Sequence, residues 1–402
     1  MNILYVTGDI KWPMTNGTAI RHWNIIQGLR KVGNVDIVAC AGEQGAVHAE
    51  SYRGCGDVYC IAPEVVQETP AQLRRRKSNA RRAVDILSKK FPHDFTLGDV
   101  TVARAKFGEI VRRKRYALIW VEGLRFGISL DVEGAAQGAV TVLDADDFSW
   151  QRDLSVLWHT ARYGAKIFDY ADVLKTRFWE MRCGQYYSYV VRCSQDDATR
   201  QGGTNVWVIP NGTDVPVVVR RRPTVSALFV GQLGYPPNRL GVEWFIMRMW
   251  PKIVSAVQGA RFDVVGMNPS KEILAANGRA GIRVHGFVQD LREFYEQATM
   301  SVVPLQAGGG TRLKILESIG RAVPVVSTSV GAYGIPLTES QGLIRRDDES
   351  AFAHACIELL ANCGDKLQEA ASAGRKTVMQ DYNWQRIQTL VAEHVSKVFK
   401  SA

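Results

Sequence analysis

The sequence has no C-x-x-C pair and no long apolar run. Its seven cysteines are odd in number and scattered along the chain, which argues against a disulfide framework or a structural zinc site. No stretch of about 18 apolar residues occurs, so we expect no membrane-spanning helix. The opening segment MNILYVTGDI has no cationic residues ahead of its apolar run, unlike a secretory signal, and this predicts a cytoplasmic protein.

The composition is that of an ordinary globular protein. Apolar residues make up 46% and charged residues 22% of the 402 positions, which excludes a disordered or collagen-like chain. A domain usually holds roughly 100–200 residues, so this length favours two domains and also allows three.

Positive charge is concentrated in one part of the chain. The net charge is +10, and the window Ala71–Arg115 carries this whole excess, with fourteen Lys or Arg against four Asp or Glu. In and directly after Arg74–Lys90, apolar residues recur at helical spacing and predict a basic amphipathic helix: Ala80, Ala83, Val84, Leu87 and Phe91. Such a helix either binds an anionic membrane surface or presents a solvated charged face. Nucleic acid is not expected, because no DNA- or RNA-binding motif accompanies the segment.

Short apolar runs alternate with amphipathic stretches in two consecutive series. The strand-like runs are Asn2–Thr7, Val35–Cys40, Ala117–Val121 and Ala139–Asp144, and then Ala227–Val230, Phe262–Val265, Met300–Pro304 and Val323–Ser327. Alternating strands and helices form parallel sheets covered by helices. We therefore predict an α/β fold with two doubly wound, Rossmann-like domains at residues 1–212 and 213–380, and a C-terminal helix at 381–402 that packs back on the first domain. Ligands bind at the carboxyl ends of such strands, so the predicted site is a cleft between the domains.

A glycine-rich turn follows one of these strands. The segment Ser301–Glu317 runs from an apolar strand into Gly308-Gly309-Gly310 and then opens a helix near Thr311. Glycine lets the backbone approach a ligand closely, and a helix start offers unpaired N–H donors and roughly half a positive charge. These features are typical of a diphosphate cradle, although a glycine triplet also occurs in simple turns.

The start of this helix carries two cations and a carboxylate. Thr311 can donate a hydroxyl, and Arg312 or Lys314 can neutralise a phosphate. Arg312 and Lys314 do not face the same ligand atom, whereas Lys314 and Glu317 share a helix face. That second pair is either a surface ion pair of about 0.2–0.5 kcal/mol, or a cation for phosphate beside a carboxylate that accepts from ribose hydroxyls.

The segment Val303–Thr328 resembles the donor-site segment of retaining nucleotide-sugar glycosyltransferases of family four, which have the GT-B fold. Other similar pieces follow in the family's order: Gly17, Ile209–Asp214, Phe229-Val230-Gly231, Val284–Val288 and Val323–Thr328. The stretch Phe229–Pro251 resembles the branch associated with exopolysaccharide assembly. The resemblance spans most of the chain and is specific mainly in its second half.

By this resemblance, the second domain binds the nucleotide sugar. Glu317 is implied to bind the ribose, and the backbone of Val288 to contact the base. Arg312 or Lys314 is implied to balance the charge of the leaving nucleotide. The residues implied to border the diphosphate are Gly309, Gly310 and Thr311, together with Gly231 and Asn238. No metal is expected, because Arg312, Lys314 and the helix dipole can stabilise the leaving diphosphate. Gly309 stands where the family often has a glutamate.

The first domain is implied to bind the acceptor. Gly17 and Thr18 open its first helix, and Arg21 follows one turn later as either an anion contact or a solvent-exposed charge. Asp144 ends a strand, where catalytic groups gather in such sheets. It is predicted to stabilise positive charge at the anomeric carbon or to orient the acceptor hydroxyl. Asp147 is predicted as a further acceptor contact, unless the Asp-rich segment is only a polar turn.

These features together predict a hexosyl-type glycosyltransferase that moves a sugar from a UDP- or GDP-sugar to a hydroxyl acceptor, with retention implied by the resemblance. The expected acceptor is a glycan or lipid-linked glycan in surface polysaccharide assembly. The nucleotide sugar is a co-substrate, and no cofactor is expected. An anionic membrane surface is an expected partner through Arg74–Lys90, at the inner face of the membrane. Two alternatives stay open: epimerisation of the sugar nucleotide, and a catalytically silent protein that binds nucleotide sugars or partner proteins.

Overall fold

The computed structural model of the chain describes residues 1–8, 17–40, 52, 54–61, 100–160, 166–216, 221–361 and 365–400. The chain divides into two compact units, Met1–Pro210 with Ile387–Ala402, and Asn211–Arg386. The predicted basic segment Arg74–Lys90 lies outside the described residues. None of the described helices has the length and apolar character needed to span a bilayer.

The N-terminal unit is built on a parallel sheet of seven strands in the order β3-β2-β1-β4-β5-β6-β7. The strands are β1 (Asn2–Thr7), β2 (Asn34–Ala39), β3 (Val58–Cys60), β4 (Leu118–Glu122), β5 (Val140–Asp144), β6 (Tyr189–Arg192) and β7 (Val206–Val208). Their registers place Thr7, Glu122 and Asp144, the last residues of β1, β4 and β5, next to one another. The carboxyl edge of this sheet is therefore polar.

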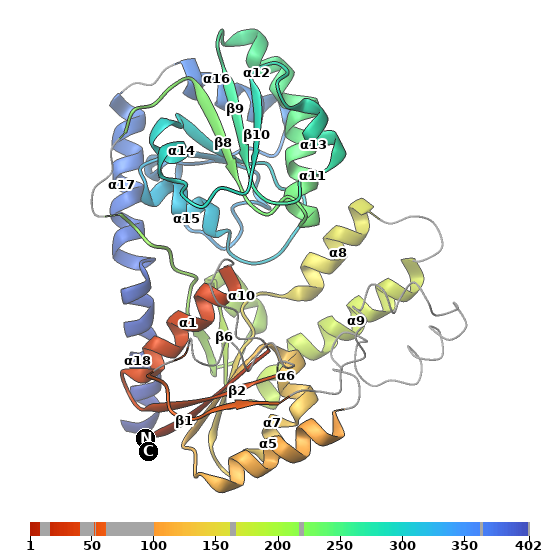
Figure 1. Ribbon diagram of the computed structural model, residues 1–402, viewed down its shortest axis with the longest axis vertical. Coiled ribbons are helices and arrows are strands. Elements are labelled where there is room, and N and C mark those ends of the chain that lie inside the picture. Colours follow the sequence, from red (N-terminus) through yellow and green to blue (C-terminus); the bar gives the residue numbers. More distant parts are fainter. Residues whose placement is uncertain are drawn as a thin grey trace. The chain divides into compact units, whose positions relative to one another are not determined.

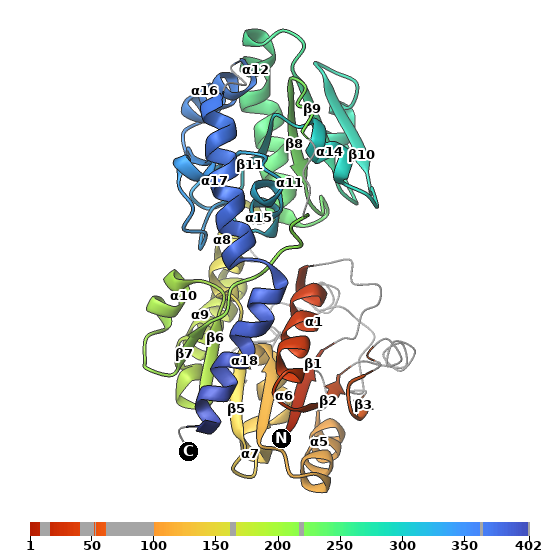
Figure 2. The same ribbon diagram turned by 90° about the vertical axis from the view of Figure 1, so that its left-hand side faces the viewer.

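Helices cover both faces of this sheet, as parallel sheets require (Figures 1 and 2). They are α1 (Gly17–Arg30), α5 (Thr101–Arg113), α6 (Gly123–Leu130), α7 (Val132–Ala135), α8 (Ser149–Thr160), α9 (Lys166–Arg182) with the 3-10 turn η3 (Cys183–Gln185), α10 (Gln195–Gln201) and α18 (Trp384–Lys400). Residues of α5, α6, α7 and α9 form one core with one face of the sheet. Helices α1 and α18 lie side by side (Figure 2), and Gln388 Nε2 donates to Asn24 Oδ1 at 2.9 Å. A side chain at Gly28 would collide with α18.

The C-terminal unit repeats the same design with six parallel strands in the order β10-β9-β8-β11-β12-β13. The strands are β8 (Ser226–Val230), β9 (Arg261–Val265), β10 (Ile282–Gly286), β11 (Met300–Val303), β12 (Val325–Ser327) and β13 (Leu343–Arg345). Both sheets follow the strand order of doubly wound nucleotide-binding folds. The predicted fold class of two doubly wound, Rossmann-like α/β domains is confirmed.

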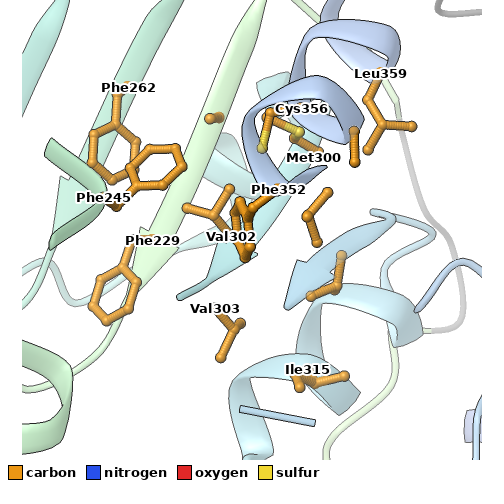
Figure 3. Close-up of a cluster of buried hydrophobic side chains, with 14 of the residues drawn as sticks. Phe229, Phe245, Phe262, Met300, Val302, Val303, Ile315, Phe352, Cys356 and Leu359 are labelled. Atoms are coloured by element: carbon orange, nitrogen blue, oxygen red, sulfur yellow. The ribbon is translucent and has the colours of Figure 1, made fainter. Parts of the chain in front are cut away.

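The helices of this second unit enclose an aromatic core. They are α11 (Pro236–Trp244), the π-helical turn η4 (Phe245–Met249), α12 (Trp250–Ala256), α13 (Lys271–Ala276), α14 (Arg292–Gln297), α15 (Leu313–Gly320), the 3-10 turn η5 (Glu339–Gln341), α16 (Glu349–Ala361) and α17 (Asp365–Asp381). Phe245 packs against Phe262 and Phe352 with ring centroids 4.8 and 5.9 Å apart (Figure 3). Val302 of β11 belongs to the same buried cluster. This core fixes the strands whose carboxyl ends carry the candidate site.

The helical segment that follows β8 is divided because prolines determine its course. Helix α11 begins with Pro236 and Pro237 in its first turn, where a missing N–H costs nothing. The chain then passes through η4, and α12 starts at Trp250 with Pro251 in its first turn. Pro251 has no N–H and so cannot continue the hydrogen-bond ladder of an α-helix across this point.

Candidate active site

The glycine-rich turn leads into α15 close to the predicted position. The helix begins at Leu313 with Arg312 as its N-cap residue. Gly308 and Gly310 adopt φ values of 119° and 78°, which favour glycine. The Arg312 guanidinium donates to the carbonyl oxygen of Gly309, and a side chain at Gly308 would overlap that guanidinium. Arg312 therefore shapes the turn that precedes the N–H groups of the first turn of α15.

Three residues of the predicted donor site lie together at the carboxyl end of β8. Lys314 Nζ donates to Asn238 Oδ1 at 2.7 Å and lies 4.2 Å from the centroid of the Phe229 ring. A Cβ added at Gly231 would lie 2.7 Å from Lys314 Nζ, so a larger residue would push against the ammonium. Asn238 Nδ2 in turn donates to the carbonyl of Gln232 at 2.9 Å. The loop after β8, α11 and α15 thus hold one ammonium group in place.

The surroundings of Lys314 disfavour its charge. Burial, with a further contribution from the Arg312 guanidinium, lowers the pKa of Lys314 to about 7, while Glu317 acts in the opposite direction. A nearby anion stabilises the protonated form of an amine and raises its pKa. An anionic group bound at this position would therefore return the full charge to Lys314.

Glu317 lies one turn along α15 and meets a tyrosine that the sequence did not single out. The hydroxyl of buried Tyr295, on α14, donates to Glu317 Oε2 at 3.2 Å. Burial and the Glu317 charge raise the pKa of Tyr295 well above its usual value, so the hydroxyl keeps its proton. The Arg321 guanidinium lies 4.8 Å from the centroid of the same ring. Among the described residues no partner is found for Glu317 Oε1, and the side chain is half-buried.

Val288 follows β10 and lies near the Tyr295–Glu317 pair. Its backbone is implied by the family resemblance to contact the nucleotide base. Its side chain packs against a small apolar cluster that contains Tyr295, Leu228 and Val323. The cluster therefore links the position implied for the base to Tyr295, which holds the carboxylate implied for the ribose. These residues all belong to the C-terminal unit.

Arg21 and Asp144, both predicted for the acceptor side, form a buried ion pair in the N-terminal unit. Arg21 Nη2 lies 2.9 Å from Asp144 Oδ1, and both side chains are only 2% exposed. Arg21 Nη1 also donates to the carbonyl of Ile209 at 3.1 Å, and its Nε lies 3.8 Å from Asp146 Oδ1. Burial opposes the charge of Arg21, but Asp144 and Asp146 outweigh it and raise the pKa. Arg21 is thus a buried cation, not the solvent-exposed charge considered from its helical position.

The remaining predicted acceptor residues surround the same edge of this sheet. Gly17 opens α1, and Thr18 is exposed in its first turn. Asp147 lies between β5 and α8 and lines a pocket of about 170 Å³ after the ends of β4, β5 and β6. Leu124 and Leu143 line the same pocket.

Two buried charges of that pocket were not found from the sequence. The carboxylate of Glu180 accepts from the backbone N–H groups of Ser149 and Trp150 at 3.0 and 3.2 Å, which holds the start of α8. Burial raises the pKa of Glu180 to about 7, although these hydrogen bonds and Arg192 oppose the shift. The Arg192 guanidinium stacks 3.8 Å from the centroid of the Phe148 ring. Their contacts join distant segments, so no local motif marks them.

A largely shielded His–Glu pair lies beside the Arg21–Asp144 pair. Glu122 Oε2 lies 3.0 Å from His22 Nδ1, and it accepts hydrogen bonds from the Thr7 hydroxyl and from the backbone N–H of Gly8. His22 carries no motif of its own in the sequence. The structure brings it to the carboxyl ends of β1 and β4 because α1 crosses that edge. Across the described ranges, no three His, Cys, Asp or Glu side chains are grouped closely enough to hold a metal ion.

Comparisons with known proteins agree with this fold, and one family model covers the residues around Lys314. Residues 224–362 match the family model described as Glycosyl transferases group 1. This segment includes Gly231, Asn238, Val288 and the whole of α15. The two doubly wound units have the fold of GT-B glycosyltransferases, and residues 224–362 form a glycosyl transferase group 1 domain.

Several solved structures share little sequence identity with this chain, but their folds are similar over nearly its whole length. Sucrose-phosphate synthase from Thermosynechococcus elongatus is similar over 100% of both chains, with a TM-score of 0.67 and 15% identity. TarM from S. aureus reaches a TM-score of 0.68 at 10% identity, over 96% of this chain and 97% of TarM. HepE from Anabaena, solved in complex with UDP-glucose, has a TM-score of 0.61 at 15% identity, over 99% of this chain and 100% of HepE.

One sequence relative comes from Klebsiella pneumoniae and is described as "Uncharacterized 44.6 kDa protein in cps region". It is 24% identical over 170 residues, which are 40% of this chain and 44% of that protein. The match thus spans less than half the length of that relative.

Proposed function

We propose that this protein is a retaining, hexosyl-type glycosyltransferase that moves a sugar from a UDP- or GDP-sugar to a hydroxyl acceptor. The observation that carries the proposal is the contact of Lys314 with Asn238 at 2.7 Å beside Gly231, at the glycine-rich start of α15. These residues lie in the matched glycosyl transferase group 1 segment. HepE, of the same fold, is solved with UDP-glucose, which supports a nucleotide-sugar donor. Retention rests on the resemblance to family four alone.

In this proposal the C-terminal unit binds the donor. The N–H groups that begin α15 and the Lys314 ammonium hold the diphosphate and stabilise the charge that develops as the nucleotide leaves. Gly309, Gly310 and Thr311 border the same group, and Arg312 keeps the turn in shape through its bond to Gly309. Lys314 would be the leaving-group cation, and the chemistry needs no metal at this position.

The proposed acceptor is a glycan or lipid-linked glycan in surface polysaccharide assembly. The resemblance to the exopolysaccharide branch and the cps-region relative from Klebsiella pneumoniae support this. Gly17, Thr18 and Asp147 at the carboxyl edge of the first sheet are the proposed acceptor contacts. A peripheral position on an anionic membrane, through Arg74–Lys90, remains part of the proposal.

The direct test of this function uses radiolabelled UDP- and GDP-sugars with purified protein. We expect at least one of them to bind and to release its nucleoside diphosphate, faster when an acceptor glycan is added. No binding and no release with every donor would refute the proposed function. An altered sugar nucleotide formed without any acceptor would identify an epimerase instead.

Replacing Glu317 with alanine is expected to weaken UDP binding by about 10–100-fold, because hydrogen bonds to a charged group contribute about 1.5–3 kcal/mol. The loss should depend on the ribose hydroxyls. We therefore titrate wild type and Glu317→Ala with UDP and with 2′,3′-dideoxy-UDP by calorimetry. The wild type should bind UDP more tightly than the dideoxy compound, whereas the variant should bind both equally. Glu358→Ala, at an exposed position of α16, is the matched control. A Glu317→Ala protein that still prefers UDP over the dideoxy compound would contradict the ribose assignment.

Binding of a nucleoside diphosphate is expected to take up a proton at Lys314. With a pKa of about 7 in the free protein, this amine is mostly neutral at pH 8, and the bound diphosphate favours its charged form. Affinity should therefore fall as the pH rises above 7, by up to about tenfold per pH unit. Titration calorimetry at pH 8 in phosphate and in Tris buffers measures the uptake as a difference in binding enthalpy. The same enthalpy in both buffers would show that Lys314 does not titrate on binding.

A further inference from the structure

The pocket of about 170 Å³ after the ends of β4, β5 and β6 has described lining residues from the N-terminal unit alone. They come from the first turn of α6, the segment that follows β5, the start of α8, the end of α9 with η3, and the end of β6. Pockets for drug-sized ligands usually span about 300–1,000 Å³, so this one has room for a single sugar ring. It can therefore be considered without reference to the C-terminal unit.

Arg125, in the first turn of α6, carries an unpaired charge at the wall of this pocket. Within the described residues its guanidinium has no hydrogen-bond or ion-pair partner, and its Nε is shielded from solvent. Shielding a charged donor costs free energy unless an acceptor compensates for the lost water. The buried guanidinium of Arg21, in contrast, has Asp144 as its partner. Arg125 therefore indicates a ligand that accepts hydrogen bonds and carries negative charge, because ionised acceptors form the strongest hydrogen bonds with a guanidinium.

A second guanidinium, that of fully buried Arg192, adds to the positive charge of the pocket. It donates to neutral oxygen atoms, those of the Gln201 side chain and of the Ala145 and Asp147 backbone. Across the described ranges no carboxylate forms an ion pair with either guanidinium. These hydrogen bonds hold Arg192 in place, so its charge is a fixed part of the pocket.

Two carboxyl groups also line the pocket, those of Glu180 and half-buried Asp147. Burial raises the pKa of Glu180 to about 7, against the opposing effects of its hydrogen bonds and of Arg192. Near neutral pH this carboxyl group carries only part of its charge, so the two guanidinium groups outweigh the two acids. Carboxylate oxygens accept hydrogen bonds from hydroxyl groups, and Leu124 and Leu143 add an apolar wall. The pocket thus fits a ligand with hydroxyl groups, an apolar C–H face and one negatively charged group.

We propose that the pocket binds an acidic sugar of the acceptor glycan, and that Arg125 selects this sugar by pairing with its anionic group, a carboxylate or a phosphate. A planar guanidinium fits either anion with two parallel hydrogen bonds. The ring hydroxyls donate to Asp147 and Glu180. The role as an acceptor site rests on the proposed glycosyl transfer, whereas the binding of the sugar does not. Arg125 is thus the residue that distinguishes acidic from neutral acceptors.

Two substitutions isolate the contribution of the Arg125 guanidinium. Arg125→Gln keeps a hydrogen-bond donor and removes the charge, whereas Arg125→Lys keeps the charge and loses the paired hydrogen-bond geometry. Because Arg125 has no partner among the described residues, neither change should disturb the fold, and thermal denaturation checks this. Arg112→Gln, at an exposed position of α5, is the matched control.

The full chain is titrated by calorimetry with ligands that differ only in the group at one ring carbon: methyl glucoside, methyl glucuronide and methyl glucoside 6-phosphate, together with their galacto counterparts. We expect at least one acidic ligand to bind the wild type about 10–100-fold more tightly than its neutral counterpart, the usual effect of a hydrogen bond to a charged group. The glucuronide and the phosphate show which anion is preferred. Arg125→Gln should bind acidic and neutral sugars equally, Arg125→Lys should retain part of the preference, and Arg112→Gln should match the wild type.

Three results of these titrations would overturn the inference: no binding of any acidic sugar, equal binding of acidic and neutral sugars by the wild type, and a preference that persists in folded Arg125→Gln. Acetate or inorganic phosphate that binds as tightly as the acidic sugars would also overturn it, because the pocket would then recognise a simple anion. The affinity for UDP and GDP is measured on the same samples and should not change in Arg125→Gln. A wild type that binds nucleotide but no acidic sugar leaves the proposed function intact. If acidic sugars bind through Arg125 but no nucleotide binds, the pocket is confirmed as a sugar site and the proposed glycosyl transfer fails.

Discussion

Replacing Lys314 with methionine is expected to lower the rate of sugar transfer by about 10²–10³-fold, the usual loss when one preorganised group that stabilises developing charge is removed. Lys314 is held by Asn238 at 2.7 Å and lies over the Phe229 ring, so its ammonium cannot be replaced by a neighbouring side chain without rearrangement. Methionine has a similar length and no charge. It also removes the repulsion from Arg312 that lowers the pKa of Lys314, so the fold should be preserved.

The rates of wild type, Lys314→Met and Lys252→Met are compared at saturating donor. Lys252 is an exposed lysine of α12, and its substitution controls for the general loss of one positive charge. Its rate should equal that of the wild type. If Lys314→Met retains a rate within a few fold of wild type, the leaving diphosphate is stabilised elsewhere and the assigned role of Lys314 is wrong.

The Asp144→Ala substitution is expected to destabilise the N-terminal unit by about 3–5 kcal/mol, because it leaves a buried cation without its main partner. Arg21 is 2% exposed and cannot turn to solvent without opening the edge of the sheet. Asp146 lies 3.8 Å from Arg21 but is 44% exposed, so it compensates only in part. Urea denaturation and calorimetry measure the loss.

A double substitution distinguishes this cause from general damage to β5. Arg21→Met/Asp144→Ala removes both charges and should recover most of the lost stability, since a buried ion pair can be replaced by apolar side chains at little cost. Glu109→Ala, which removes the partner of exposed Arg113 on α5, should change stability by less than about 1 kcal/mol. A double variant that is no more stable than Asp144→Ala would show that the unpaired cation is not the cause.

Much of the fold could be predicted because its determinants are local. Strands buried on both faces of a parallel sheet are near-continuous apolar runs, and β1, β4, β8 and β11 are such runs. The start of α15 is also determined by local sequence, because the glycines, the N-cap residue Arg312 and the charged Lys314 of the first turn all lie within Gly308–Lys314. Gly231 and Asn238 were singled out by resemblance to a family motif, and in the structure both lie next to Lys314.

The remaining features depend on contacts between distant parts of the chain. Arg21 and Asp144 are 123 residues apart, and the sequence places both near a site without showing that they neutralise each other. Helical spacing puts Glu317 on one face with Lys314, but its partner Tyr295 comes from another helix. His22 becomes notable only when Glu122, from the fourth strand, lies 3.0 Å away. Periodicity predicts which face is buried, and tertiary packing decides which polar groups meet there.

A crystal structure of the protein soaked with UDP, or with GDP if that binds more tightly, tests the central claim most directly. The account predicts density for the diphosphate at the N–H groups that begin α15, within hydrogen-bond distance of Lys314 Nζ, with the ribose hydroxyls on Glu317. A nucleotide bound anywhere else, with the turn at Gly308–Thr311 unoccupied, would contradict it.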